Sequence, residues 1–217
     1  MPDVSANWRR DHPWAAVYDF FIERERLNRP LGWLLFGTDT QLLYRAIAAI
    51  AQVPEGGAIL DVPCGGGVAL RGLEPGREVR YVAADISPSM LERTASVARE
   101  RGLDQVETCA ADVEDLPFGD GEFDLCLSLT GLHCFPRPAL AVAEIARCLR
   151  PGGRLAGSMF VTDAGLRYAP LVLAGRAMGM MGPSGGGDEL ERWLRGAGLK
   201  QRRVERSGAL AYFSAER

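Results

Sequence analysis

The sequence lacks several features that mark common classes of protein. It has no excess of basic residues, because 25 Lys and Arg face 28 Asp and Glu and the formal net charge is −3. A nucleic-acid partner normally requires a basic face that neutralises phosphates, so this balance argues against one. It favours instead a small, uncharged or apolar substrate.

Cysteine pairs with the spacing of a metal or redox motif are also missing. The five cysteines are odd in number and none forms a CxxC pair, which argues against zinc sites and thioredoxin-like sites. We expect no metal site and interpret them as buried, reduced thiols of a cytoplasmic protein. They are Cys64, Cys109, Cys126, Cys134 and Cys148.

Long apolar runs are absent as well. The start, Met1-Pro2-Asp3, has an acid and no apolar core of a signal peptide. Gly, Arg or Pro interrupts every apolar stretch before the length that a membrane span needs. At 217 residues, without repeats, the chain is expected to form one soluble domain, as a monomer or homodimer.

What the sequence does contain, from residue 58 onward, is an alternation of short apolar runs with helical patterns. Ser87-Pro88 predicts the start of a helix that Gly102 ends. Such alternation predicts parallel strands joined by right-handed crossovers. The expected strands are Ala58–Val62, Glu78–Ala84, Gln105–Ala110, Glu122–Leu129 and Arg154–Phe160, with helices near Val68–Leu73, Pro138–Leu149 and Gly187–Gly196.

The end of the chain departs from this rhythm. Two runs, Leu199–Glu205 and Ala209–Ala215, flank Ser207-Gly208, which predicts a hairpin turn. We therefore expect a doubly wound, mostly parallel, seven-stranded α/β sheet ending in an antiparallel hairpin. Residues 1–57, with helical patterns at Trp14–Arg26 and Asp39–Gln52, are expected to form a helical cap on the core of residues 58–217.

A glycine-rich turn follows the first strand, in the run ILDVPCGGG over residues 59–67. Its glycines let backbone approach a ligand closely, at the carboxyl edge where open α/β sheets bind ligands. Asp85 ends the next strand, twenty residues after Gly65, where a carboxylate can accept hydrogen bonds from ribose hydroxyls. The dinucleotide pattern G-x-G-x-x-G is missing, and Asp61 suits an ammonium group better than a pyrophosphate.

In these motifs the sequence resembles the class I S-adenosylmethionine-dependent methyltransferases, particularly the group that includes ubiquinone and menaquinone biosynthesis enzymes. ILDVPCGGG is similar to the family's first motif, VAADIS to its second, AADVEDLPF to its third and FDLCLSLTGLHCF to its fourth. LRPGGRL is similar to the signature before the fifth strand. The resemblance covers residues 58–160 and implies a Rossmann-like fold with S-adenosyl-L-methionine as cofactor.

For the methionine and ribose part of the cofactor, the resemblance implies one role per position. Asp61 would hold the ammonium group, Asp85 the ribose hydroxyls, and Gly65 and Gly67 would pass beneath the ligand. The same loop contributes Pro63 and Cys64. Pro63 departs from the family, which usually has glycine there, and proline lacks a backbone N–H.

For adenine and the reacting methyl group, the resemblance implies a second set of positions. Those at the adenine are Ile86, Ser87, Met90, Asp112 and Val113. Ser128 and Leu129 would lie beneath the sulfonium. Two alternatives stay open: Asp85 could be an ordinary acid at a helix start, and Asp112 a carboxylate that caps its own loop.

Two aromatic side chains complete the expected site. His133 follows the fourth strand and is the one imidazole base expected there, although it could instead line the pocket. Tyr18 is similar to the aromatic segment that closes over the cofactor in some relatives, or packs in the core. Met178 and Met181 could form an adaptable wall for an apolar acceptor, or pack in the core.

Three functions are compatible with these motifs. The first is methyl transfer from S-adenosylmethionine to an oxygen or carbon of a small, fairly apolar molecule. The second retains the cofactor but catalyses another reaction, such as cyclisation. The third is a non-enzymatic binding protein, against which the retained acids Asp61, Asp85 and Asp112 speak.

Overall fold

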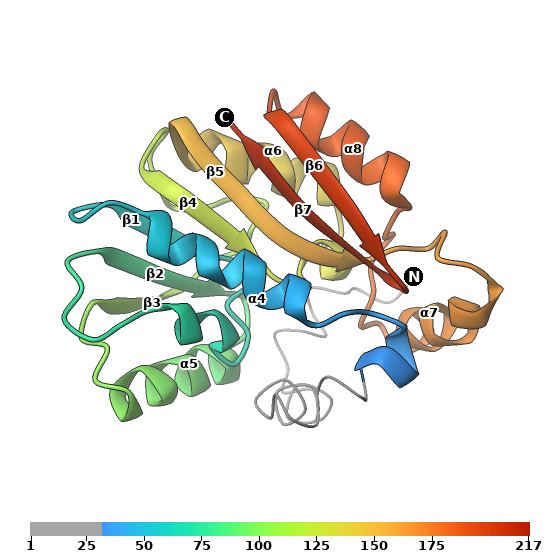
Figure 1. Cartoon of the computed structure of the whole chain (residues 1–217), viewed down its shortest axis with the longest axis horizontal. Coiled ribbons are helices and arrows are strands. Elements are labelled where there is room, and N and C mark those ends of the chain that lie inside the picture. Colours follow the sequence, from blue (N-terminus) through green and yellow to red (C-terminus); the bar gives the residue numbers. More distant parts are fainter. Residues whose placement is uncertain (1–31) are drawn as a thin grey trace.

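The computed structural model describes residues 32–217, which form one seven-stranded sheet with helices on both faces (Figure 1). The strand order is β3-β2-β1-β4-β5-β7-β6. The strands are β1 (Ala58–Asp61), β2 (Arg80–Asp85), β3 (Val106–Ala110), β4 (Phe123–Ser128), β5 (Leu149–Phe160), β6 (Lys200–Ser207) and β7 (Leu210–Glu216).

Helical elements separate most consecutive strands along the chain, except between β3 and β4 and between β6 and β7. The α-helices are α4 (Gln41–Ile47), α5 (Pro88–Glu100), α6 (Pro138–Cys148), α7 (Ala169–Ala177) and α8 (Gly187–Gly196). The other helical elements are short. They are a π-helix, η1 (Gly32–Phe36), and the 3-10 helices η2 (Ala48–Gln52), η3 (Val68–Gly72), η4 (Leu132–Cys134) and η5 (Leu166–Tyr168). None of the helices within residues 32–217 combines the length and apolar character needed to cross a membrane.

The pairing of the strands confirms the predicted fold. β1 to β5 pair in parallel, whereas β7 runs antiparallel to both β5 and β6. The predicted turn at Gly208 has a positive φ of 57°, and a Cβ there would lie 2.1 Å from the Phe36 carbonyl oxygen. Glycine is therefore required twice over at the hairpin, by conformation and by space.

Two hydrophobic clusters lie on opposite faces of the sheet because successive strand residues point to opposite sides. On β1, Ile59 belongs to the cluster beneath α4, η2 and η3, and Leu60 to the cluster beneath α6 and α8. Asp61 shares the face of Ile59, and Val62 that of Leu60. The alternation thus carries Asp61 toward the same side as α4 and η3.

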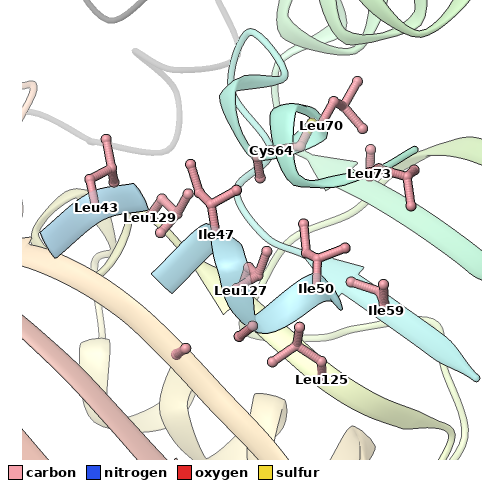
Figure 2. Packing of buried hydrophobic residues seen from close by; sticks show 14 of the residues in the cluster. Leu43, Ile47, Ile50, Ile59, Cys64, Leu70, Leu73, Leu125, Leu127 and Leu129 are labelled. Carbon is pink, nitrogen blue, oxygen red and sulfur yellow. The ribbon is translucent and has the colours of Figure 1, made fainter. Parts of the chain in front are cut away.

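The segment before β1 covers this face of the sheet. Figure 2 shows Leu43, Ile47 and Ile50 from α4 and η2 beside Leu125, Leu127 and Leu129 of β4 and its exit. All of these side chains are buried. The sequence predicts one amphipathic helix over residues 39–52. The structure has an α-helix, α4, from Gln41 to Ile47, which continues directly into the 3-10 helix η2 from Ala48 to Gln52. The division into a cap of residues 1–57 and a core stays a prediction, because it includes residues outside the described range.

The observed β5 is longer than predicted. It begins at Leu149 rather than Arg154, because Leu149 pairs with Phe123 before a register shift. The predicted breaker Gly152 donates its N–H to the Arg217 carbonyl at 3.0 Å, and the Arg217 N–H donates to the Gly153 carbonyl at 2.9 Å. Pairing with the end of the chain therefore carries the strand through Pro151-Gly152-Gly153. Helix α7 was not predicted.

Candidate functional site at the carboxyl edge of the sheet

Three polar side chains meet where adjacent central strands end. Asp61 ends β1, Asp85 ends β2 and Ser128 ends β4, and the sheet places these strands in the order β2-β1-β4. The three are 1%, 5% and 0% exposed, respectively. Buried polar side chains cost free energy unless they are paired, so the arrangement points to a binding site.

Asp85 anchors the glycine turn. One carboxylate oxygen, Oδ2, accepts the Gly65 N–H at 3.0 Å, and Oδ1 accepts the Ser87 N–H at 2.9 Å. The side chain therefore ties the loop after β1 to the start of α5. A carboxylate oxygen has two lone pairs and is therefore a suitable acceptor for a ligand hydroxyl as well as a backbone N–H.

The two outer glycines of the turn differ, because Gly65 borders open space whereas Gly67 packs against α5. Gly65 has φ 51° and a Cβ there would meet no atom within 4 Å, so its backbone borders open space. Gly67 has φ 85°, and its Cβ would lie 3.2 Å from Thr94 Oγ1. The Thr94 hydroxyl donates to the Gly65 carbonyl at 2.7 Å and lies 3.6 Å from Cys64 Sγ. These contacts attach the loop to α5.

Asp61 uses only one of its two carboxylate oxygens in hydrogen bonds with the described residues. Its Oδ2 accepts the Tyr81 hydroxyl at 2.8 Å, whereas its buried Oδ1 accepts no hydrogen bond from any described residue. Burial raises the pKa of Asp61 from 3.8 to about 7, with the Tyr81 hydrogen bond opposing the rise and Asp85 adding to it. A buried carboxylate with one free oxygen is suited to a cation such as an ammonium group.

Pro63 and Cys64 shape the loop from inside. The Val62–Pro63 peptide bond is cis, and a Cβ on Gly131 would lie 2.3 Å from Pro63 Cδ, so the proline ring packs against the exit of β4. The Cys64 N–H donates to the Ala84 carbonyl at 2.9 Å. Burial and the nearby acids raise the pKa of the Cys64 thiol, which stays protonated.

The residues assigned to adenine occupy two loops. Ser87 and Met90 are buried and Ile86 is half-buried at the start of α5. Ser87 occupies the predicted N-cap position without a capping hydrogen bond from its side chain, because its Oγ lies 3.1 Å from Ser89 Oγ instead.

The loop after β3 carries the other two adenine positions. Asp112 Oδ1 accepts the Glu114 N–H at 3.1 Å, and the Asp112 carbonyl accepts the Asp115 N–H at 3.0 Å. In this arrangement the Asp112 carboxylate caps its own loop, which is one of the two alternatives for this residue. Val113 packs in the cluster beneath α6. The adenine contacts of both loops stay predictions.

The exit of β4 brings together the residues assigned to the sulfonium. Ser128 Oγ is fully buried and has no hydrogen-bond partner among residues 32–217. A Cβ on Gly131 would lie 2.8 Å from that oxygen. Leu129 packs in the cluster with Leu43 and Leu127 (Figure 2).

His133 lies in η4 and is buried. Its Nδ1 accepts the Phe160 N–H at 3.3 Å, and the two rings meet edge-to-face with centroids 4.8 Å apart. The neutral ring is therefore assigned its proton on Nε2. Burial lowers the pKa of His133 from 6.5 to about 3, which makes the imidazole a weak base. Its catalytic role stays a prediction.

Several residues that the sequence reasoning missed complete the site. Tyr81 and Thr94 contact the glycine loop, and the Ser158 hydroxyl accepts the Thr130 N–H at 3.0 Å beyond β4. Thr130 itself has a positive φ of 51°, which is uncommon for a residue other than glycine. None of these carries a local sequence signal, because each acts through strand register or tertiary packing.

Two expectations need separate mention. Tyr18 lies outside the described residues. Within residues 32–217, no three His, Cys, Asp or Glu side chains are grouped to hold a metal ion. Met178 and Met181 are expected either to line an acceptor pocket or to pack in the core. Met181 packs in the core, whereas Met178 is 41% exposed at the end of α7.

Comparison with known proteins identifies the kind of domain that contains this site. Residues 60–157 match a family model described as a methyltransferase domain. The chain is 34% identical over 159 residues to the O-methyltransferase cnsE of Penicillium expansum, covering 73% of this chain and 57% of that protein. It is 35% identical over 127 residues to a fatty-acid O-methyltransferase of Mycolicibacterium smegmatis, covering 58% and 43%, respectively. The chain spans between 33% and 57% of the length of such curated relatives.

Among solved structures, the fold is similar to geranyl diphosphate C-methyltransferase from Streptomyces coelicolor A3(2). The TM-score is 0.66 at 16% identity, over 81% of this chain and 79% of that one. That protein was crystallised with Mg²⁺, geranyl diphosphate and S-adenosyl-L-homocysteine. The resemblance to ubiquinone and menaquinone enzymes in particular stays a prediction. By this match, residues 60–157 are a methyltransferase domain, and the seven-stranded sheet that contains them has the fold of the solved methyltransferase that it resembles.

Proposed function

We propose that the chain transfers a methyl group from S-adenosyl-L-methionine to an oxygen or carbon of a small, fairly apolar molecule. The observation that carries the proposal is the convergence of Asp61, Asp85 and the open backbone of Gly65 within the matched methyltransferase domain. When bound, S-adenosylmethionine supplies an activated sulfonium methyl group.

The protein's own residues fit such a ligand. The Asp61 Oδ1, which has no partner among residues 32–217, matches an ammonium group, and the Asp85 carboxylate is a suitable acceptor for ribose hydroxyls. The buried Ser128 Oγ has no partner in the described part of the chain, so it can bond a polar atom of the ligand at the exit of β4. Orienting the acceptor and excluding water supply most of the catalysis that such a displacement requires.

The state of His133 bears on the acceptor. A buried, neutral imidazole that uses Nδ1 as acceptor offers an Nε2–H donor rather than a base near neutral pH. A carboxylate acceptor needs no base, because it is already ionised. The similarity to a fatty-acid O-methyltransferase supports an acceptor of this kind. We also propose a reducing, cytoplasmic location, since all five cysteines are free thiols.

Calorimetric titration with S-adenosylmethionine and S-adenosylhomocysteine tests the cofactor. We expect Asp85→Ala to weaken binding of both ligands at least about 100-fold, since it removes the ribose acceptor and an anchor of the loop. Asp188→Ala, whose side chain is 98% exposed on α8, is the matched control and should bind as the wild type does. Unchanged affinity in Asp85→Ala would defeat the assignment.

Mass spectrometry then tests the reaction. Incubating the protein and a cell extract with a methyl-labelled cofactor should produce a labelled small molecule that Asp85→Ala does not produce. Tight cofactor binding without any labelled product in a range of extracts would instead support the alternative, in which the cofactor is held for a reaction such as cyclisation.

A further inference from the structure

Tyr81 places a phenol in the interior of the cofactor side of the sheet. It lies on β2, where its Cα pairs with Ile59 of β1, and Asp61 follows Ile59 by two residues. Side chains two residues apart share a face of a strand, so Tyr81 and Asp61 point to the same side of the sheet. Both are buried, at 0% and 1% exposure.

The contact between them uses one oxygen of the carboxylate. The Tyr81 hydroxyl donates to Asp61 Oδ2 at 2.8 Å, and Oδ1 has no partner among the residues described. A phenylalanine would fill the same volume without a hydroxyl that must be satisfied. The phenol therefore holds the carboxylate in one orientation, in which a single oxygen stays available.

Within residues 32–217, the titratable groups that interact with Asp61 are acidic or neutral. They are Asp85 on β2, Cys64 after β1, Cys126 on β4 and Tyr81 itself. Burial raises the pKa of both thiols, so they remain uncharged. Tyr81 is the group among these that stabilises the Asp61 carboxylate, whereas burial and Asp85 oppose it.

We infer that Tyr81 is a positioning residue that holds the Asp61 carboxylate for the ammonium group of the ligand's amino-acid tail. This inference rests on the proposed function and adds a residue to its site. Tyr81 does not touch the reacting atoms. It acts through Asp61, by fixing which oxygen is free and by favouring the ionised carboxylate.

Calorimetry with two ligands separates this role from a general structural one. S-adenosylhomocysteine carries the ammonium group, whereas methylthioadenosine contains the adenosine and lacks the amino-acid tail. We expect Tyr81→Phe to weaken binding of S-adenosylhomocysteine about ten-fold, the size expected for a hydrogen bond to a charged group, and to leave methylthioadenosine unaffected. Tyr212→Phe, which removes another buried hydroxyl bonded to Thr38 Oγ1 at 2.9 Å, should change neither.

The pH profile and a second variant provide readouts that packing alone would not change. Affinity for S-adenosylhomocysteine should rise with pH as Asp61 loses its proton, and Tyr81→Phe should move that rise to higher pH. In an Asp61→Asn background, Tyr81→Phe should have no further effect on S-adenosylhomocysteine.

Three results would overturn the role of Tyr81: wild-type affinity and pH profile in Tyr81→Phe, equal losses for both ligands, or an undiminished effect in the Asp61→Asn background. If the wild type binds neither ligand, the proposed function itself fails.

Discussion

The two sides of the carboxyl edge are built differently. On the cofactor side, after β1 and β2, acids are held by backbone N–H groups and by residues close in the sheet, as Asp85 is by Gly65 and Ser87. Beyond β4, neutral groups meet through contacts between distant segments, such as Phe160 with His133 and Ser158 with Thr130. A charged ligand of fixed structure suits the first side, and an acceptor of variable structure suits the second.

The largest expected effect concerns the open space at Gly65. Gly65→Ala should lower affinity for S-adenosylhomocysteine at least about 100-fold, because the methyl group would project into the open space that the Gly65 backbone borders. Gly102→Ala is the matched control, since Gly102 also has a positive φ and an open Cβ position. Both variants should lose about 1 kcal/mol of stability from backbone strain. If calorimetry gave equal affinities for the two variants, the assignment of the ligand to the open space at Gly65 would be contradicted.

The second effect is the pH dependence of stability that Asp61 imposes. Its folded pKa of about 7 lies above the unfolded value of 3.8, so the native state binds the extra proton and stability falls as pH rises between these values. Urea denaturation from pH 4 to pH 8 should show this loss, and Asp61→Asn should reduce it by roughly 2–4 kcal/mol. A wild-type profile that matches Asp61→Asn would contradict the buried, partly protonated carboxylate.

On the other side of the edge, His133 should show the opposite sign. Its folded pKa of about 3 lies below 6.5, so its contribution to stability is present above pH 6.5 and is lost as pH falls toward 3. In NMR spectra, the His133 ring signals should stay constant between pH 5 and pH 8, with His133→Gln identifying them among the two histidines. A midpoint near 6.5 would restore His133 as a candidate base.

The smallest effect separates two buried serines. Ser128→Ala should change stability by less than about 0.5 kcal/mol, because its hydroxyl has no partner among the described residues. Ser158→Ala should cost about 1–2 kcal/mol, because it removes the hydroxyl that accepts the Thr130 N–H. Thermal denaturation compares them directly. A cost for Ser128→Ala as large as that for Ser158→Ala would show that Ser128 is structural rather than available to a ligand.

The same division explains what the sequence could predict. The strands, the glycine turn and the acids Asp61 and Asp85 follow from local patterns, since strand ends and glycines with positive φ are encoded within a few residues. The orientation of Asp61 depends on Tyr81, twenty residues away, and the low basicity of His133 depends on burial beside Phe160. The early start of β5 depends on the pairing of Leu149 with Phe123, and its passage through Gly152 and Gly153 depends on pairing with Arg217. Such effects arise from tertiary contacts that no local pattern contains.

The Thr94 hydroxyl, which donates to the Gly65 carbonyl, couples the glycine loop to the second turn of α5. Opening of the loop must break that bond or move the first turns of α5. Amide hydrogen exchange should therefore slow on binding not only at Gly65 but also around Thr94. Removing the hydroxyl by Thr94→Val should confine the protection to the loop, so that the helix no longer reports whether the ligand is bound.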